Sequence, residues 1–298
     1  MDQDPALIPA IDEARRKYKA ILASILPPHM LTQDGVLRPA PGRAEQVDFI
    51  PPCPEDNSLV GRLSRVLLGS RDSAAMPGEY AYYEGALMLK VLRHNLEKWR
   101  QRIPHEEYGV LKAYVEMELS KLGNKADIIK TAGGIHAGTL AHETFHDIQG
   151  FLYDNYPHIM DTLHASQDEH KDVVSKWFSD KSNSEWTGPR DYKIEHFYPT
   201  FETKSPYGAD LMVAAYYAVK NKLGREPSDS VFIPLGNTQW DFGRNELVPV
   251  LLSASAVGNK GASDILKVFF GECGLNQNFA DGLQVVFQPD DVGWSWLS

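Results

Sequence analysis

The chain has 298 residues, a formal net charge of −10 and 43% hydrophobic residues. This length and apolar content suffice for one large domain or two modest ones. The acidic balance, with no run rich in Lys or Arg, argues against a general nucleic-acid-binding protein. The two cysteines, Cys53 and Cys273, are too few for a disulfide framework, so both are predicted to be free thiols.

No stretch of the sequence has the pattern of a secretion signal or a membrane span. The N-terminus is acidic and leads into an amphipathic stretch rather than an apolar signal core. The apolar stretch at residues 247–257 is far shorter than the roughly 20 residues that cross a bilayer. We therefore expect no membrane partner, and a protein that is cytoplasmic or exported without a general-secretion signal peptide. No feature predicts the oligomeric state.

Residues 1–125 are expected to form a helical N-terminal region, which belongs either to a separate domain or to one domain with the rest. Apolar positions near a 3.6-residue period predict helices at residues 8–26, 57–69, 80–101 and 106–122. Closely spaced prolines between residues 39 and 54 predict a long irregular segment that interrupts this region.

Residues 126–298 are expected to combine helices with a few strands. Helices are predicted at residues 138–149, 161–178, 206–223, 245–254 and 263–271. Short strands are predicted at residues 128–131, 228–235 and 283–288. The segment at residues 179–203, rich in aromatic side chains, is either one wall of a substrate cleft or a surface loop that covers the core.

The most informative pattern in the chain is His-Glu-Thr-Phe-His at residues 142–146. In a helix, positions i and i+4 lie on one face, so the rings of His142 and His146 can reach a single ion. Gly138 is predicted to lie at the flexible start of this helix, and Gly150 is predicted to end it. The spacing predicts a zinc site.

This arrangement of residue types suits hydrolysis. A catalytic zinc takes three protein ligands and keeps its fourth position for water, whose pKa it lowers to about 7. Glu143 is rotated roughly 100° from His142 along the helix, so it can flank the metal without ligating it. We therefore assign His142 and His146 as metal ligands and Glu143 as the general base.

A strand, a loop and then the motif helix is an order that resembles the zincin metallopeptidases. The resemblance implies an α+β, predominantly helical fold, in which residues 126–298 form a zincin-like region with a small sheet and the HExxH active-site helix. It also implies an edge strand that binds an extended substrate through its main chain, at residues 128–131 here. Metzincins would continue with a glycine and a third histidine, where this chain has Gln149 and Leu152.

The chain is more similar to the gluzincins, in which the third zinc ligand is a glutamate from a later helix. Glu246 fits this role because it is the only carboxylate in an apolar predicted helix, where Asn245 would be the cap and Pro249 would fall near the first turn. Other donors remain open. They are Glu169, Asp210, Glu202, Cys273 and His164.

Residues that support the metal or the reaction are less well defined by sequence. A zinc-bound histidine normally donates its second N–H to a neighbouring acceptor, for which Asp147 and Asp241 are candidates. A donor that stabilises the oxyanion is also required. The candidates are Tyr207, Tyr216, Tyr217, His196 and Arg244.

The motif thus predicts a zinc-dependent metallopeptidase that hydrolyses peptide bonds of a protein or peptide substrate. A helical protein with no metal, in which the five-residue pattern arises by chance, also stays open. Two further alternatives use the same residues. One is a zinc hydrolase that acts on a small amide or cell-wall substrate, and the other is a non-catalytic binding protein on a zincin scaffold.

Overall fold

The computed structural model describes residues 8–38, 78–122, 137–183, 192–200 and 209–286. Within these ranges some residues have a described backbone only, and Glu143 is one of them. The predicted helix at residues 57–69 and the predicted strand at residues 128–131 lie outside the described residues. No helix in the described ranges is long and apolar enough to cross a membrane.

The chain divides into two compact units, each built from separate stretches of sequence. The first contains residues 1–81, 124–192 and 247–298, and the second contains residues 82–123 and 193–246. Both units therefore combine residues from the predicted N-terminal region with residues that follow it.

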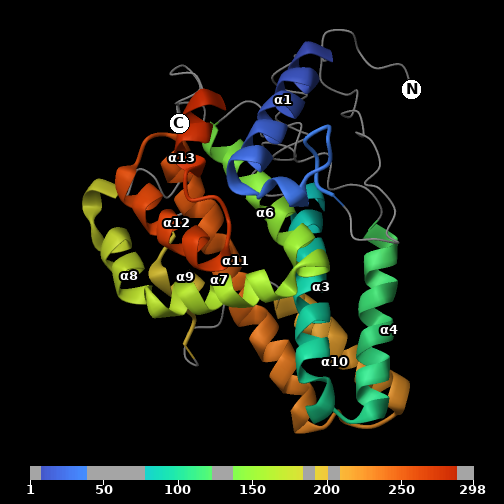
Figure 1. Cartoon of the computed structure of the whole chain (residues 1–298). Helices are drawn as coiled ribbons and strands as arrows, with labels where there is room; N and C mark the ends of the chain where they lie inside the picture. Colours follow the sequence, from blue (N-terminus) through green and yellow to red (C-terminus); the bar gives the residue numbers. More distant parts are fainter. Residues whose placement is uncertain (1–7, 39–77, 123–136, 184–191, 201–208, 287–298) are drawn as a thin grey trace. The chain divides into compact units, whose positions relative to one another are not determined.

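Three phenylalanine rings connect helices in the core of the first unit. Helix α1 (Ile8–Ile25) contacts α6 (Ala137–Asn155) and α13 (Phe279–Val286), as Figure 1 shows. Helix α7 (Pro157–Glu169) contacts α6 and α12 (Lys260–Cys273), and α12 also contacts α8 (Lys171–Ser179). The ring of Phe270 stacks on Phe145 at 5.7 Å and meets Phe279 edge-on at 4.9 Å. These contacts join α12 to both α6 and α13.

Local chemistry explains where the elements of this unit begin, end and approach one another. Helix α12 begins after Asn259, whose side chain accepts a hydrogen bond from the Ala262 N–H at 2.9 Å. It ends at Gly274, which takes the left-handed conformation at φ 76°. A Cβ at Gly282 would lie 2.5 Å from the Ser24 Cβ, so this glycine permits the close contact of α13 with α1.

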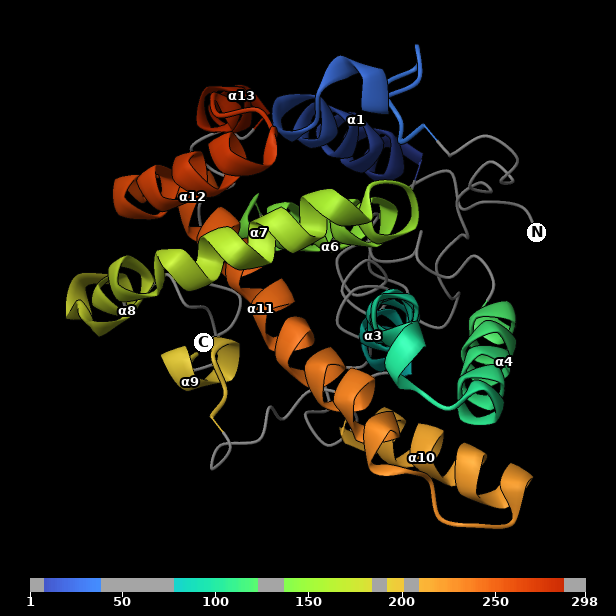
Figure 2. The same ribbon diagram turned by 60° about the horizontal axis from the view of Figure 1, so that its bottom comes forward.

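The second unit is also helical. It contains most of α3 (Gly78–Trp99), α4 (His105–Leu122), the short α9 (Ile194–Phe197) and α10 (Ala209–Leu223), which Figure 2 shows from below. Helix α10 packs on α4. Short 3₁₀ turns occur at Pro28–Met30 in the first unit and at Arg100–Arg102 and Asp229–Val231 in the second.

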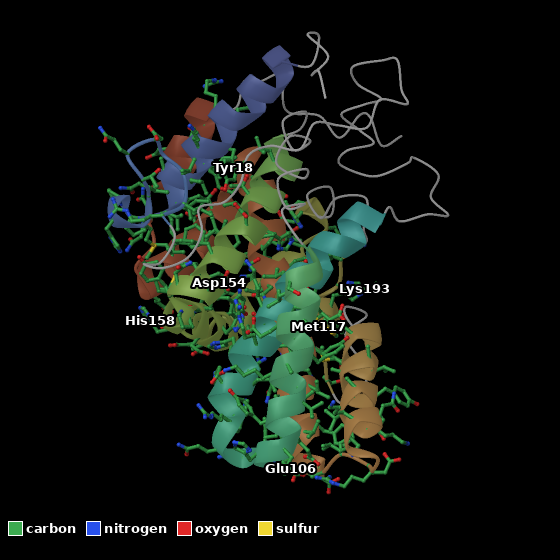
Figure 3. All side chains as sticks on the ribbon, turned by 90° about the vertical axis from the view of Figure 1, so that its right-hand side faces the viewer. Tyr18, Glu106, Met117, Asp154, His158 and Lys193 are labelled. Atoms are coloured by element: carbon green, nitrogen blue, oxygen red, sulfur yellow. The ribbon has the colours of Figure 1, made fainter. Side chains whose placement is uncertain are left out.

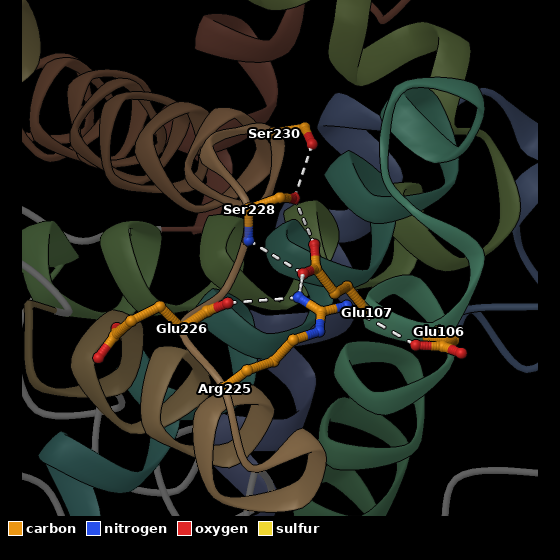
Figure 4. Close-up of polar contacts among 6 residues, drawn as sticks. All are labelled: Glu106, Glu107, Arg225, Glu226, Ser228 and Ser230. Atoms are coloured by element: carbon orange, nitrogen blue, oxygen red, sulfur yellow. Dashed lines mark hydrogen bonds and ion pairs between the residues drawn. The ribbon is translucent and has the colours of Figure 1, made fainter.

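A buried carboxylate on α4 joins that helix to the segment that follows α10. Glu107 is fully buried and accepts hydrogen bonds from the Ser228 N–H at 2.9 Å, from the Ser228 hydroxyl and from Arg225 Nη1 at 2.6 Å (Figure 4). Burial alone would raise the pKa of Glu107, but hydrogen bonds from Ser228 and Arg225 outweigh it and hold the pKa below its ordinary value.

Helix α11 (Phe232–Ala256) corrects three sequence predictions. The segment at residues 228–235 is a 3₁₀ turn followed by the start of α11, not a strand. From this turn into α11, buried residues recur at helical spacing, at Val231, Leu235, Thr238 and Phe242. Asn245 therefore does not cap a helix, and Pro249 lies inside one rather than in its first turn.

The predicted small sheet is wrong for the described residues. They contain helices, turns and one isolated antiparallel bridge between Leu31 and Leu37, but no strand. Residues 283–286 of the strand predicted at residues 283–288 lie in α13, where Phe279 and Leu283 are buried four residues apart, as a helix requires. Residues 287 and 288 lie outside the described residues. The helical part of the prediction is compatible with the structure, and the α+β class is not.

Two helix boundaries also differ from the prediction. Helix α6 continues through Gly150 to Asn155, because Phe151 and Leu152 extend its buried face and outweigh the low helix propensity of one glycine. The single helix predicted at residues 161–178 is two helices, α7 and α8, which are separated at His170.

Candidate metal centre

Helix α6 places the two motif histidines side by side. His142 and His146 are 9% and 3% exposed, and their Nε2 atoms lie 3.0 Å apart. The rings meet edge-on with centroids 4.7 Å apart. Both rings therefore direct the same nitrogen toward one region, as the i and i+4 spacing predicts.

The other ring nitrogen of His146 is held by a residue on the same helix. Nδ1 of His146 lies 2.9 Å from Oε1 of Gln149, which is fully buried. An amide oxygen only accepts, so this contact is a hydrogen bond when Nδ1 carries the ring proton, and that tautomer leaves the lone pair of Nε2 available for a metal. This role of Gln149 was not predicted from the sequence, for which Asp147 and Asp241 were the candidates. The signal was the i, i+3 spacing, which places residues 146 and 149 on one helix face.

The third donor comes from α11. Glu246 is fully buried, and one of its carboxylate oxygens joins a nitrogen of His142 and a nitrogen of His146 in a group whose atoms all lie within 4.8 Å of one another. Glu246 is the last residue of the second unit, but α11 continues without a break into residues 247–256 of the unit that contains α6. The hydroxyl of Ser253, on that part of α11, donates to the Gly138 carbonyl of α6 at 2.8 Å.

These three side chains fit a zinc ion. Two nitrogens bound to one tetrahedral zinc at about 2.0–2.1 Å lie about 3.3 Å apart, close to the observed 3.0 Å. Two imidazoles and one carboxylate are a donor set of catalytic zinc, and a cation between them would offset the cost of burying the Glu246 carboxylate. The structure thus brings together the three residues that sequence analysis selected as ligands.

Glu143 follows His142 in α6, and its side chain lies outside the described residues. Its backbone position, one residue along the helix, gives the rotation of roughly 100° on which its predicted role depends.

The competing ligands are elsewhere or outside the described part of the chain. Glu169 is exposed at the end of α7, in a different group with His170 and Glu272. His164 is buried, with Nε2 3.4 Å from the Tyr153 hydroxyl. The Sγ of Cys273 donates to the Phe269 carbonyl at 3.0 Å, and burial raises the pKa of this thiol to about 11. Glu202 and the side chain of Asp210 lie outside the described residues.

The two aspartates considered as supports of the histidines have other contacts. The Tyr18 hydroxyl on α1, labelled in Figure 3, donates to Asp147 of α6 and links these helices. Asp241 lies within α11, where it accepts from Asn95 Nδ2 at 3.0 Å and pairs with Arg244 at 3.4 Å.

The described candidates for the oxyanion donor have the following contacts and exposure. Tyr216 donates to Glu226, and Tyr217 is 50% exposed. Nδ1 of His196 accepts from the Lys193 N–H at 3.3 Å, and the His196 carbonyl would lie 2.6 Å from a Cβ at Gly243. This glycine therefore lets α9 approach α11 within the second unit. Tyr207 lies outside the described residues.

A cavity of about 580 Å³ lies in the first unit between α8 and α12, away from the three ligands. Trp177, Val268 and Phe269 give it an apolar wall, and Lys176, Asp180 and Asp264 add charge to it. Asp180 and Asn183 belong to the segment that was predicted either to line a cleft or to cover the core, and they line this cavity. Residues 184–191 and 201–203 of that segment lie outside the described ranges.

Comparison of the chain with models of protein families, with curated proteins and with solved structures finds no match. The resemblance to zincins therefore depends on the motif and on the geometry of its side chains.

Proposed function

We propose that this protein is a zinc-dependent metallopeptidase of gluzincin type, with His142, His146 and Glu246 as zinc ligands. The observation that supports this proposal is the convergence of two histidines from α6 and a buried glutamate from α11 within 4.8 Å. The ligands come from two helices about 100 residues apart in sequence, which a chance HExxH pattern on a polar helix would not produce.

Zinc bound there would polarise the scissile carbonyl and acidify a water molecule. In the proposed reaction Glu143 takes the proton from the attacking water and returns it to the leaving amine. Gln149 keeps the proton of His146 on Nδ1, so that Nε2 remains a donor of electrons. Glu246 provides the negative charge that distinguishes this donor set from two neutral imidazoles.

The decisive variant is Glu143→Gln, which removes the base and leaves all three proposed ligands in place. Zinc-loaded wild-type protein and this variant are compared on a library of fluorogenic peptides and on unfolded casein. We expect cleavage by the wild type, and a loss of at least about 100-fold in the variant, since general base catalysis contributes 10²–10⁴-fold. Zinc content should be equal in both.

Two results would overturn the proposal. One is cleavage by Glu143→Gln at the wild-type rate, which would remove the base from the mechanism. The other is a wild-type protein that holds zinc at these residues and cleaves no peptide or protein, which would favour the small-amide or binding alternatives.

A further inference from the structure

A second group of metal-binding side chains lies where α7 and α12 end in the first unit. One ligand atom from each of Glu169, His170 and Glu272 falls within 4.8 Å of the others. Glu169 is the last residue of α7, His170 follows it, and Glu272 is the penultimate residue of α12. Nε2 of His170 lies 2.9 Å from Oε1 of Glu272.

The electrostatics at this point favour a cation. The C-terminal end of a helix carries partial negative charge, so carboxylates there are unfavourable and cations are favourable. Two helix C-termini, those of α7 and α12, each place a glutamate at this point. The many contacts between the two helices fix their relative position, so the donors are held by packed backbone rather than by a loop.

A buried hydroxyl is directed at the same place. Ser166, one turn before Glu169 and His170 on α7, is 2% exposed, and its Oγ makes no hydrogen bond of ordinary geometry. The Ser166 hydroxyl nevertheless lies close to the carboxyl of Glu272, so a buried polar group from α7 faces the cluster.

We propose that Glu169, His170 and Glu272 form a second site for a divalent transition-metal ion, separate from the centre at His142. One imidazole and two carboxylates suit ions such as Zn²⁺ and Mn²⁺. The side chains of His170 and Glu272 are 29% and 40% exposed, so water completes the coordination and the ion binds more weakly than at the buried centre. The bound ion joins the ends of α7 and α12.

The test is the number of zinc ions bound per chain, measured by equilibrium dialysis and elemental analysis. We expect two for the wild type, one for Glu272→Gln and one for His146→Ala, because each variant removes a different site. Asp264→Asn is the matched control, since it removes an exposed carboxylate from the same helix without touching the cluster, and it should bind two. Circular dichroism checks that all variants keep their helices.

The second site would be overturned if the wild type binds fewer than two zinc ions and His146→Ala binds none. It would also be overturned if Glu272→Gln still binds two zinc ions. A loss of the second zinc ion from Asp264→Asn as well as from Glu272→Gln would likewise overturn it, because surface charge alone would then explain the binding. The retention of one equivalent by His146→Ala, lost when Glu272→Gln is added, supports the second site whether or not the protein is a peptidase.

Discussion

Gln149→Leu isolates the contribution of one buried amide to the proposed zinc centre. Gln149 is fully buried and accepts from Nδ1 of His146 at 2.9 Å. Leucine is similar in size but cannot accept a hydrogen bond. The variant therefore leaves an N–H of a buried ring, 3% exposed, without its acceptor.

The loss of a group that orients a metal ligand typically weakens metal affinity by about 10–100-fold, which is about 1.4–2.7 kcal/mol. We therefore expect zinc to bind Gln149→Leu roughly 10–100-fold more weakly than the wild type.

The assay is competition for zinc with a chromophoric chelator at neutral pH, in a Glu272→Gln background so that a single site is titrated. Gln149→Glu is the matched control, because it keeps an acceptor for Nδ1 and should bind zinc at least as tightly as the wild type. Equal zinc affinities for Gln149→Leu and the wild type would refute this account of how His146 is oriented.

Other predictions concern stability and reactivity. Glu107→Ala removes three hydrogen bonds, from Ser228 and a half-exposed Arg225, and should lower the free energy of unfolding in urea by about 2–3 kcal/mol. Glu106 is 75% exposed and lies 3.6 Å from the same arginine, so Glu106→Ala should lower the free energy of unfolding by less than about 1 kcal/mol. Equal losses of stability in the two variants would contradict the larger contribution of the buried carboxylate. Because folding lowers the pKa of Glu107, its carboxylate stabilises the fold at pH values above the ordinary pKa of 4.5. This stabilisation is lost as the pH falls through the pKa of Glu107 in the folded protein. Glu107→Gln should therefore weaken the pH dependence of the free energy of unfolding in urea. In a Cys53→Ser variant, Cys273 is the only thiol, and its pKa is about 11. It should react with a thiol reagent at pH 8 only as fast as the chain unfolds. Labelling at the rate of an unfolded peptide would show instead that the thiol is accessible in the folded protein.

Sequence was informative where a strong local pattern agreed with the later packing. The helix predicted at residues 8–26 is confirmed as α1, and the one at residues 106–122 as α4, because their apolar spacing matches the buried faces. Glu246 was selected because a lone carboxylate among apolar residues needs a compensating partner, and the structure places it beside two histidines about 100 residues earlier.

The errors arose where a local pattern competed with a longer one. Residues 231–233 form a short apolar run that favours a strand, but the burial of Val231, Leu235, Thr238 and Phe242 continues at helical spacing into the rest of α11. Thr238 is polar and obscured this period. Gly243 lies within α11, where a Cβ would lie 2.6 Å from the His196 carbonyl oxygen, and this contact could not be predicted from the sequence.

Long-range contacts were beyond a reading of residue patterns. The bond from Tyr18 to Asp147, between residues 129 apart in sequence, depends on how α1 packs against α6. In the same way, Glu169 was weighed as a ligand for the motif histidines, whereas the packing of α7 on α12 places it with Glu272.

X-ray absorption spectroscopy of protein loaded with one equivalent of zinc tests the central claim most directly. If zinc binds at His142, His146 and Glu246, the spectrum will show multiple scattering from two imidazoles and only nitrogen or oxygen neighbours at about 2.0–2.2 Å. The Glu246→Ala variant will show a changed first shell or retain no zinc. Sulfur ligation, fewer than two imidazoles, or an identical spectrum from Glu246→Ala would contradict the proposed metal centre.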